Sequence, residues 1–128
     1  MGNLEILIRE LIKLPDETPW LEFKHNNYEP DMIGKDISAL ANSATLHEKS
    51  CSYMIWGVQN ETHEIIGTKY NLQNIKKGNQ ELENWLRSLL SDNADFEFHC
   101  VEIENKNVGI LIIYSAVSFQ LDLRRLTI

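Results

Sequence analysis

The spacing of apolar residues along the chain predicts three amphipathic helices. The first helix has one apolar face, made of Leu4, Leu7, Ile8 and Leu11. It is expected to start with Asn3 as its cap and to end before Pro15. The second begins at Pro30 and has an apolar stripe made of Ile33, Ile37, Leu40, Ala41 and Ala44. The third, capped by Asn79, has an apolar face made of Leu82, Trp85, Leu86, Leu89 and Leu90.

Alternating and unbroken apolar runs between these helices predict strands. The expected strands are 20–24, 51–58, 63–66, 96–103 and 108–114. The run 51–58 is almost continuously apolar, which is typical of a central strand buried on both faces. The order of helix, strand, helix, hairpin, helix and hairpin predicts an α+β fold with a mixed sheet and packed helices.

Composition and charge narrow the classes of function. The chain has 128 residues, which fits one domain, and a net charge of −7. That charge argues against strong non-specific DNA binding by the whole surface, although a local basic patch stays compatible with it. The sequence shows no signal peptide and no apolar run long enough to cross a bilayer, so we expect a cytoplasmic protein without a membrane partner.

Two carboxylates near the first expected strand are candidates for chemistry. Glu17 precedes this strand and Glu22 lies within it, followed at the next outward position by Lys24. Paired carboxylates can hold a divalent cation or share acid–base work. The alternative is that these glutamates are ordinary solvated residues at the start of the strand. Their spacing alone favours this alternative.

Several polar positions could contact nucleic acid. Lys69, Lys76 and Lys77 form a local basic patch, with Tyr70 as an aromatic neighbour. Such a patch can bind single strands by charge and stacking, and it also resembles an ordinary solvated loop. The second helix carries a separate polar stripe made of Lys35, Ser38, Asn42 and Thr45. Asn60 follows the central strand, at a place where binding sites often form.

Four ordered motifs resemble the Schlafen AlbA-like domain family. They are Trp20-Leu21-Glu22-Phe23-Lys24, Ile37-Ser38-Ala39-Leu40-Ala41-Asn42-Ser43, Tyr53-Met54-Ile55-Trp56-Gly57-Val58 and Ile65-Ile66-Gly67-Thr68. The resemblance covers about residues 1–119. It implies a compact α+β domain of the kind found in bacterial transcriptional-regulator-like and RNA-binding proteins. The expected function is therefore DNA or RNA binding.

The resemblance also implies an alternative activity and its residues. Some family members cleave RNA with two glutamates and an aspartate around a divalent metal, and by position Glu17 and Glu22 match those glutamates. The aspartate position falls on Asn60, so a ribonuclease site here would be weakened. We accordingly assign Glu17, Glu22 and Lys24 as catalytic candidates, with Glu17 and Glu22 as ligands of Mg²⁺ or Mn²⁺. The expected nucleic-acid contacts are Lys24, Lys35, Asn42, Asn60, Lys69, Lys76 and Lys77.

We make two further predictions from these positions. Glu22, Lys24, Asn42 and Asn60 are expected to share one shallow pocket. Residues 116–120 resemble a late family strand that arrives early and lacks its proline. We therefore expect a domain over 1–119, an atypical tail over 120–128 and a C-terminal truncation. The apolar tail could pack poorly or mediate a homodimer.

Overall fold

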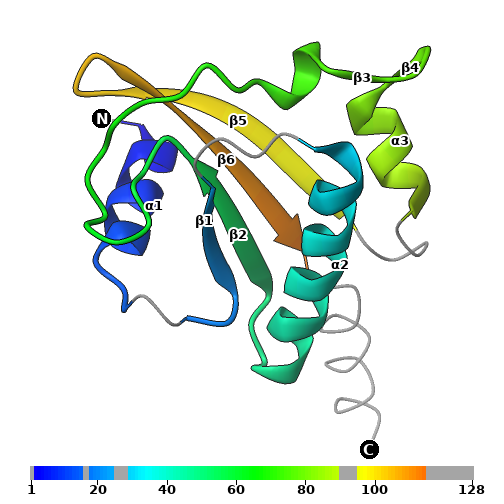
Figure 1. Ribbon diagram of the computed structural model, residues 1–128. Helices are drawn as coiled ribbons and strands as arrows, with labels where there is room; N and C mark the ends of the chain where they lie inside the picture. Colours follow the sequence, from blue (N-terminus) through cyan, green and yellow to red (C-terminus); the bar gives the residue numbers. More distant parts are fainter. Residues whose placement is uncertain (1, 16–17, 25–28, 90–94, 115–128) are drawn as a thin grey trace, which may run out of the picture.

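The structure is a computed structural model that describes residues 2–15, 18–24, 29–89 and 95–114. The described elements follow the order helix, strand, helix, strand, small irregular elements, helix and hairpin (Figure 1). They are α1 (Asn3–Ile12), β1 (Leu21–Lys24), α2 (Pro30–Leu46), β2 (Cys51–Trp56), η1 (Leu72–Asn74), β3 (Lys76–Lys77), β4 (Gln80–Glu81), α3 (Leu82–Leu89), β5 (Asp95–Ile103) and β6 (Lys106–Tyr114).

The described strands form a four-stranded sheet in the order β1-β2-β6-β5. β1 pairs with β2 in parallel, whereas β6 runs antiparallel to both β2 and β5. The sheet is therefore mixed and the fold is α+β, as the sequence predicts. β2 lies between β1 and β6, and its residues Met54, Ile55 and Trp56 are fully buried, which confirms the expected central strand.

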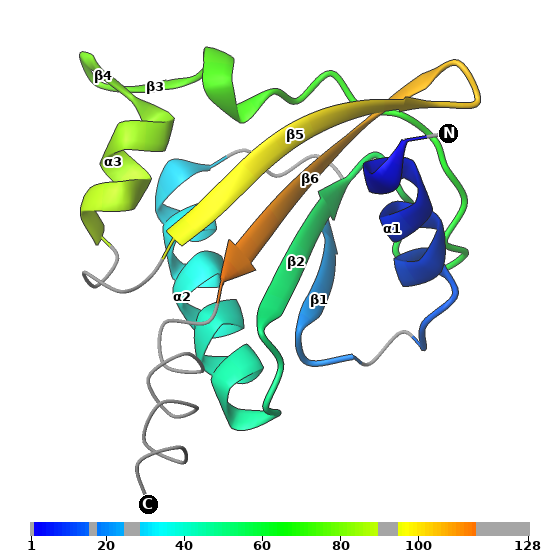
Figure 2. The same cartoon turned by 180° about the vertical axis from the view of Figure 1, so that it is seen from behind.

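Two apolar cores lie on the two faces of this sheet. Helices α2 and α3 contribute Ile33, Ile37, Leu40, Leu82 and Leu86 to one core. Helix α1 contributes Ile8 and Leu11 to the other. Figures 1 and 2 show α2 and α3 on one side of the strands and α1 on the opposite side. Alternate residues of β1 consequently face different helices: Leu21 and Phe23 belong to the α1 core.

The expected strand at 63–66 is wrong. The only ladder contact there among the described residues is an isolated bridge between Val58 and Ile65. Gly57 has a φ of 99°, and its carbonyl accepts from the backbone N–H groups of both Ile66 and Gly67. The bond from Ile66 and the bond from the Gln59 N–H to the Glu64 carbonyl together form this single bridge. The extra bond from Gly67 to the same carbonyl of Gly57 ends the pairing there, so no ladder follows.

Two expected helix caps are also wrong. Gly2, not Asn3, occupies the N-cap of α1, and it makes no side-chain cap bond. Asn79 does not cap α3, because the short strand β4 separates them and pairs with β3. The helix begins instead at Leu82, whose N–H donates to the carbonyl of Ile75. Pairs of two-residue strands such as these carry too few positions for a sequence period to reveal them.

Candidate functional site

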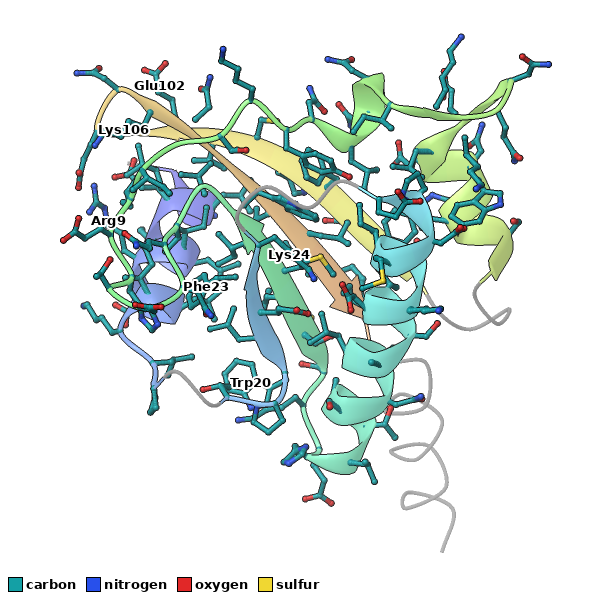
Figure 3. All side chains as sticks on the ribbon, viewed as in Figure 1. Arg9, Trp20, Phe23, Lys24, Glu102 and Lys106 are labelled. Carbon is teal, nitrogen blue, oxygen red and sulfur yellow. The ribbon has the colours of Figure 1, made fainter. Side chains whose placement is uncertain are left out.

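Lys24 links β1 to α2 through two carboxylates. Its Nζ lies 3.0 Å from Oε1 of Glu22 and 2.5 Å from Oδ2 of Asp36. The lysine side chain is only 12% exposed and that of Asp36 is 22% exposed, so the pair is largely shielded from water. Figure 3 shows Lys24 between the strands and α2, whereas Phe23 points towards α1.

The electrostatics of this triad keep Lys24 charged. Burial of the ammonium lowers its pKa, but hydrogen bonds to Asp36 and Glu22 and their negative charges outweigh burial, so the pKa of Lys24 is raised. A lysine with a raised pKa holds its proton at neutral pH and is a poor general base. The ammonium also competes with any cation for the Glu22 carboxylate. The triad therefore joins a strand to a helix.

Asn60 is exposed in the turn after β2, and Val58 and Ile65 on either side of it pack in the α1 core. His63 in this turn donates from Nδ1 to the carbonyl of Ile12 at 2.7 Å, and its ring packs 4.6 Å from the ring of Phe23. Glu22 faces α2 instead, through its contact with Lys24. The expected pocket shared by Glu22, Lys24, Asn42 and Asn60 does not match this placement. Asn42 is exposed on α2.

Two of the three loop lysines line one hollow at the start of α2. This hollow has a volume of about 630 Å³ and is lined by Pro30, Lys69, Tyr70, Asn71, Asn74, Ile75 and Lys76. Lys69 and Lys76 are exposed, and neither makes an ion pair within the described ranges. The ring of Tyr70 stacks on Trp56, 4.6 Å between centroids, so the aromatic neighbour expected for base stacking is buried in the core instead.

A second hollow, of about 620 Å³, adjoins the first between α2 and α3. It is lined by Asp31, Gly34, Lys35, Ser38 and Trp85. Lys77 borders it, since its Nζ lies 3.4 Å from Oδ1 of Asp31 and 5.2 Å from the centre of the Trp85 ring. The two hollows are neighbours in the chain: Pro30 lines the first and Asp31 lines the second, and Lys76 of the first precedes Lys77, which pairs with Asp31. Figure 1 shows α3 beside the N-terminal half of α2.

A third hollow, of about 530 Å³, lies beside α1 and differs in its charge balance. Arg9 pairs there with both Glu5 and Glu104. Lys106 donates to the carbonyl of Ile65. Figure 3 places Arg9 and Lys106 at this end of the molecule. Because these cations already have partners, they are less available to phosphate groups than Lys35, Lys69 and Lys76.

The comparison with known families agrees with the resemblance seen in the motifs. A sequence model of the family described as Schlafen, AlbA_2 matches residues 17–124. The chain belongs to this family. The family is generally associated with nucleic acids. No curated protein matches the chain in sequence.

Several assigned residues of this AlbA_2 chain stay predictions. Glu17 and the tail 120–128 lie outside the described residues, as does the end of the expected domain at 119. Within 2–15, 18–24, 29–89 and 95–114, no three His, Cys, Asp or Glu side chains gather closely enough to hold a metal ion. The Glu17–Glu22 metal pair stays a prediction. None of the helices in those ranges combines the length and apolar character of a membrane span.

Sequence reasoning missed Trp85 as a surface residue. Its position in the apolar repeat of α3 assigns it to the core, and it does pack against that core. Its ring also lines the second hollow beside Lys35 and below Lys77. The helical period alone does not indicate that Trp85 both packs against the core and lines a hollow. The second role depends on where the connection 68–81 crosses α3.

Proposed function

We propose that this chain binds single-stranded nucleic acid through a lysine surface formed by Lys35, Lys69, Lys76 and Lys77. One observation supports the proposal most: lysines from α2 and from the connection before α3 border two adjoining hollows. Lysines brought together from separated segments create the local positive field that phosphates require. The family membership points in the same direction.

The start of α2 adds to this field. The helix has 17 residues and begins at Pro30. The first N–H groups of a helix carry the positive end of its dipole, which favours phosphate at this place and partly offsets the carboxylate of Asp31 in the first turn. The net charge of −7 leaves the rest of the surface mainly acidic, which would confine phosphate contacts to this surface.

The triad around Lys24 favours binding over cleavage. A metal-dependent ribonuclease would need Glu22 to ligate a cation, and the Lys24 ammonium already lies on that carboxylate. The proposed role is therefore that of a binding module, in keeping with a cytoplasmic, transcriptional-regulator-like protein. A homodimer formed through the residues after 119 is part of the same proposal.

Charge-matched lysine variants test the proposal. We expect Lys69→Gln, Lys76→Gln and Lys77→Gln together to weaken binding of labelled oligouridylate and oligothymidylate by roughly tenfold or more. The matched control removes three charges elsewhere, through Lys13→Gln, Lys49→Gln and Lys106→Gln, and should change affinity far less. Fluorescence anisotropy across a salt series measures both affinity and the number of phosphate contacts.

Two results would contradict the proposal. Equal losses of affinity in the lysine-surface variant and in the control variant would show that binding depends only on the net charge of the protein. Rapid cleavage of the oligonucleotides on addition of Mn²⁺, abolished by Glu22→Gln, would make the chain an enzyme instead.

A further inference from the structure

The second hollow combines an aromatic ring with two lysines. Trp85 comes from α3, Lys35 comes from α2, and Lys77 comes from β3. The volume of about 620 Å³ lies in the usual range of ligand pockets, roughly 300–1,000 Å³. Gly34 lines the same hollow and has no side chain to fill it.

The partner contacts of Lys77 hold it close to the indole. Its Nζ is paired with Asp31 at 3.4 Å while lying 5.2 Å from the ring centre. Both partners are accessible, since Asp31 is exposed and the side chain of Lys77 is 39% exposed. An incoming phosphate could therefore replace the carboxylate of Asp31 as the partner of Lys77 without disturbing the core.

We infer that this hollow binds an unpaired base, with Trp85 as the stacking residue and Lys35 and Lys77 as contacts to the flanking phosphates. The inference rests on the proposed binding of single strands and adds how they are recognised: one unpaired base stacks on Trp85. Base–aromatic stacking tolerates any sequence, because every base presents a π face. A base within a duplex is already stacked on its neighbours and cannot enter a hollow between two helices.

Asp31 is expected to weaken the binding of nucleic acid in this hollow. Its carboxylate is the acidic group in a hollow otherwise lined by Lys35, Ser38, Gly34 and Trp85. It repels phosphate and competes for Lys77, so it limits affinity. Asp31→Asn should therefore tighten binding of single strands several-fold at low salt, and the gain should shrink as salt screens the charge.

The chain offers a matched control for Trp85. Trp20 also has a lysine over its ring, with Nζ of Lys49 5.0 Å from the centre, but it packs against Tyr53 away from α3. The experiment compares Trp85→Leu, Trp85→Phe and Trp20→Leu. Each is titrated with oligouridylate, with oligothymidylate and with an abasic strand of equal length, after thermal melting has shown that the variant is folded.

The inference predicts a base-dependent loss. Trp85→Leu should weaken binding to both base-containing strands by roughly tenfold and leave binding to the abasic strand unchanged, whereas Trp85→Phe should retain most of the affinity. Trp20→Leu should have little effect on any strand. Wild-type affinity in Trp85→Leu, with binding still lost in the triple lysine variant, would refute base stacking and leave the proposed function standing. Unchanged binding in both Trp85→Leu and the triple lysine variant would refute base stacking and the proposed function together.

Discussion

Lys24 illustrates how one residue can suit a catalytic motif and still have a structural role. It lies two positions after Glu22 on β1, where a sequence motif suggests chemistry. Its ammonium is shared between Glu22 and Asp36 and is mostly shielded from water. A charge so placed contributes to stability chiefly because its removal leaves a partly buried carboxylate without compensation.

We therefore expect Lys24→Met to lower the free energy of unfolding by about 1–3 kcal/mol, because Asp36 would lose its counter-ion. Urea denaturation measures the change. The double variant with Asp36→Asn should lose less than the sum of the two single variants. Nucleic-acid affinity should stay within about threefold of wild type, since Lys24 lies outside the lysine surface. A stable Lys24→Met protein that no longer binds nucleic acid would contradict this account.

At the residue scale, the sequence predicts which residues could contact phosphate better than it predicts which residues lie beside them in space. Lys35, Lys69, Lys76 and Lys77 are all identified as possible phosphate contacts from their types and positions. Their assembly around α2 depends on the course of the connection 68–81, which no periodic pattern encodes. The expected pocket of Asn60 with Glu22 is wrong for the same reason, because the positive φ of Gly57 precedes a turn whose His63 bonds to the carbonyl of Ile12 after α1.

Element boundaries follow the length of each periodic pattern. α2 spans Pro30–Leu46 and β2 spans Cys51–Trp56, close to the segments that their apolar patterns predict. The expected hairpin of 96–103 and 108–114 is also confirmed, with β6 beginning two residues earlier. Its tight turn uses Glu104 and Asn105, both with positive φ, the geometry that suits the right-handed twist of a two-residue hairpin.

Gly57 gives a test at the scale of elements, because it joins β2 to the turn. A Cβ there would lie 3.1 Å from the carbonyl oxygen of Asn107 and 3.2 Å from the backbone of Gly67, at a φ of 99°. We expect Gly57→Ala to destabilise the protein by about 2 kcal/mol or more, through strain and backbone displacement.

Gly78 is the matched control for that substitution. It also has a positive φ, 65°, but a Cβ there would meet no atom within 4 Å. Gly78→Ala should therefore cost only about 1 kcal/mol, from the left-handed backbone alone. Thermal unfolding of the two variants compares them directly. Equal destabilisation would show that crowding at the β2 exit does not matter.

In the whole molecule, the sheet separates two apolar cores, and the charged surfaces on its two sides differ. α1 covers one face of the sheet, and α2 with α3 covers the other. The lysine surface lies on the α2–α3 side, whereas the hollow beside α1 has its cations paired with carboxylates and carbonyls. Such a separation lets an acidic chain keep one face suited to phosphate.

The most direct test of this account maps where a single strand binds. A titration of isotope-labelled protein with oligouridylate, followed by amide chemical shifts, reports every backbone position at once. We predict the largest changes in the first half of α2, in 68–81 and around Trp85. Small changes are predicted at Arg9, Lys106 and the turn after β2. Changes concentrated around α1 and that turn, or no change at saturating strand, would contradict the lysine surface as the binding site.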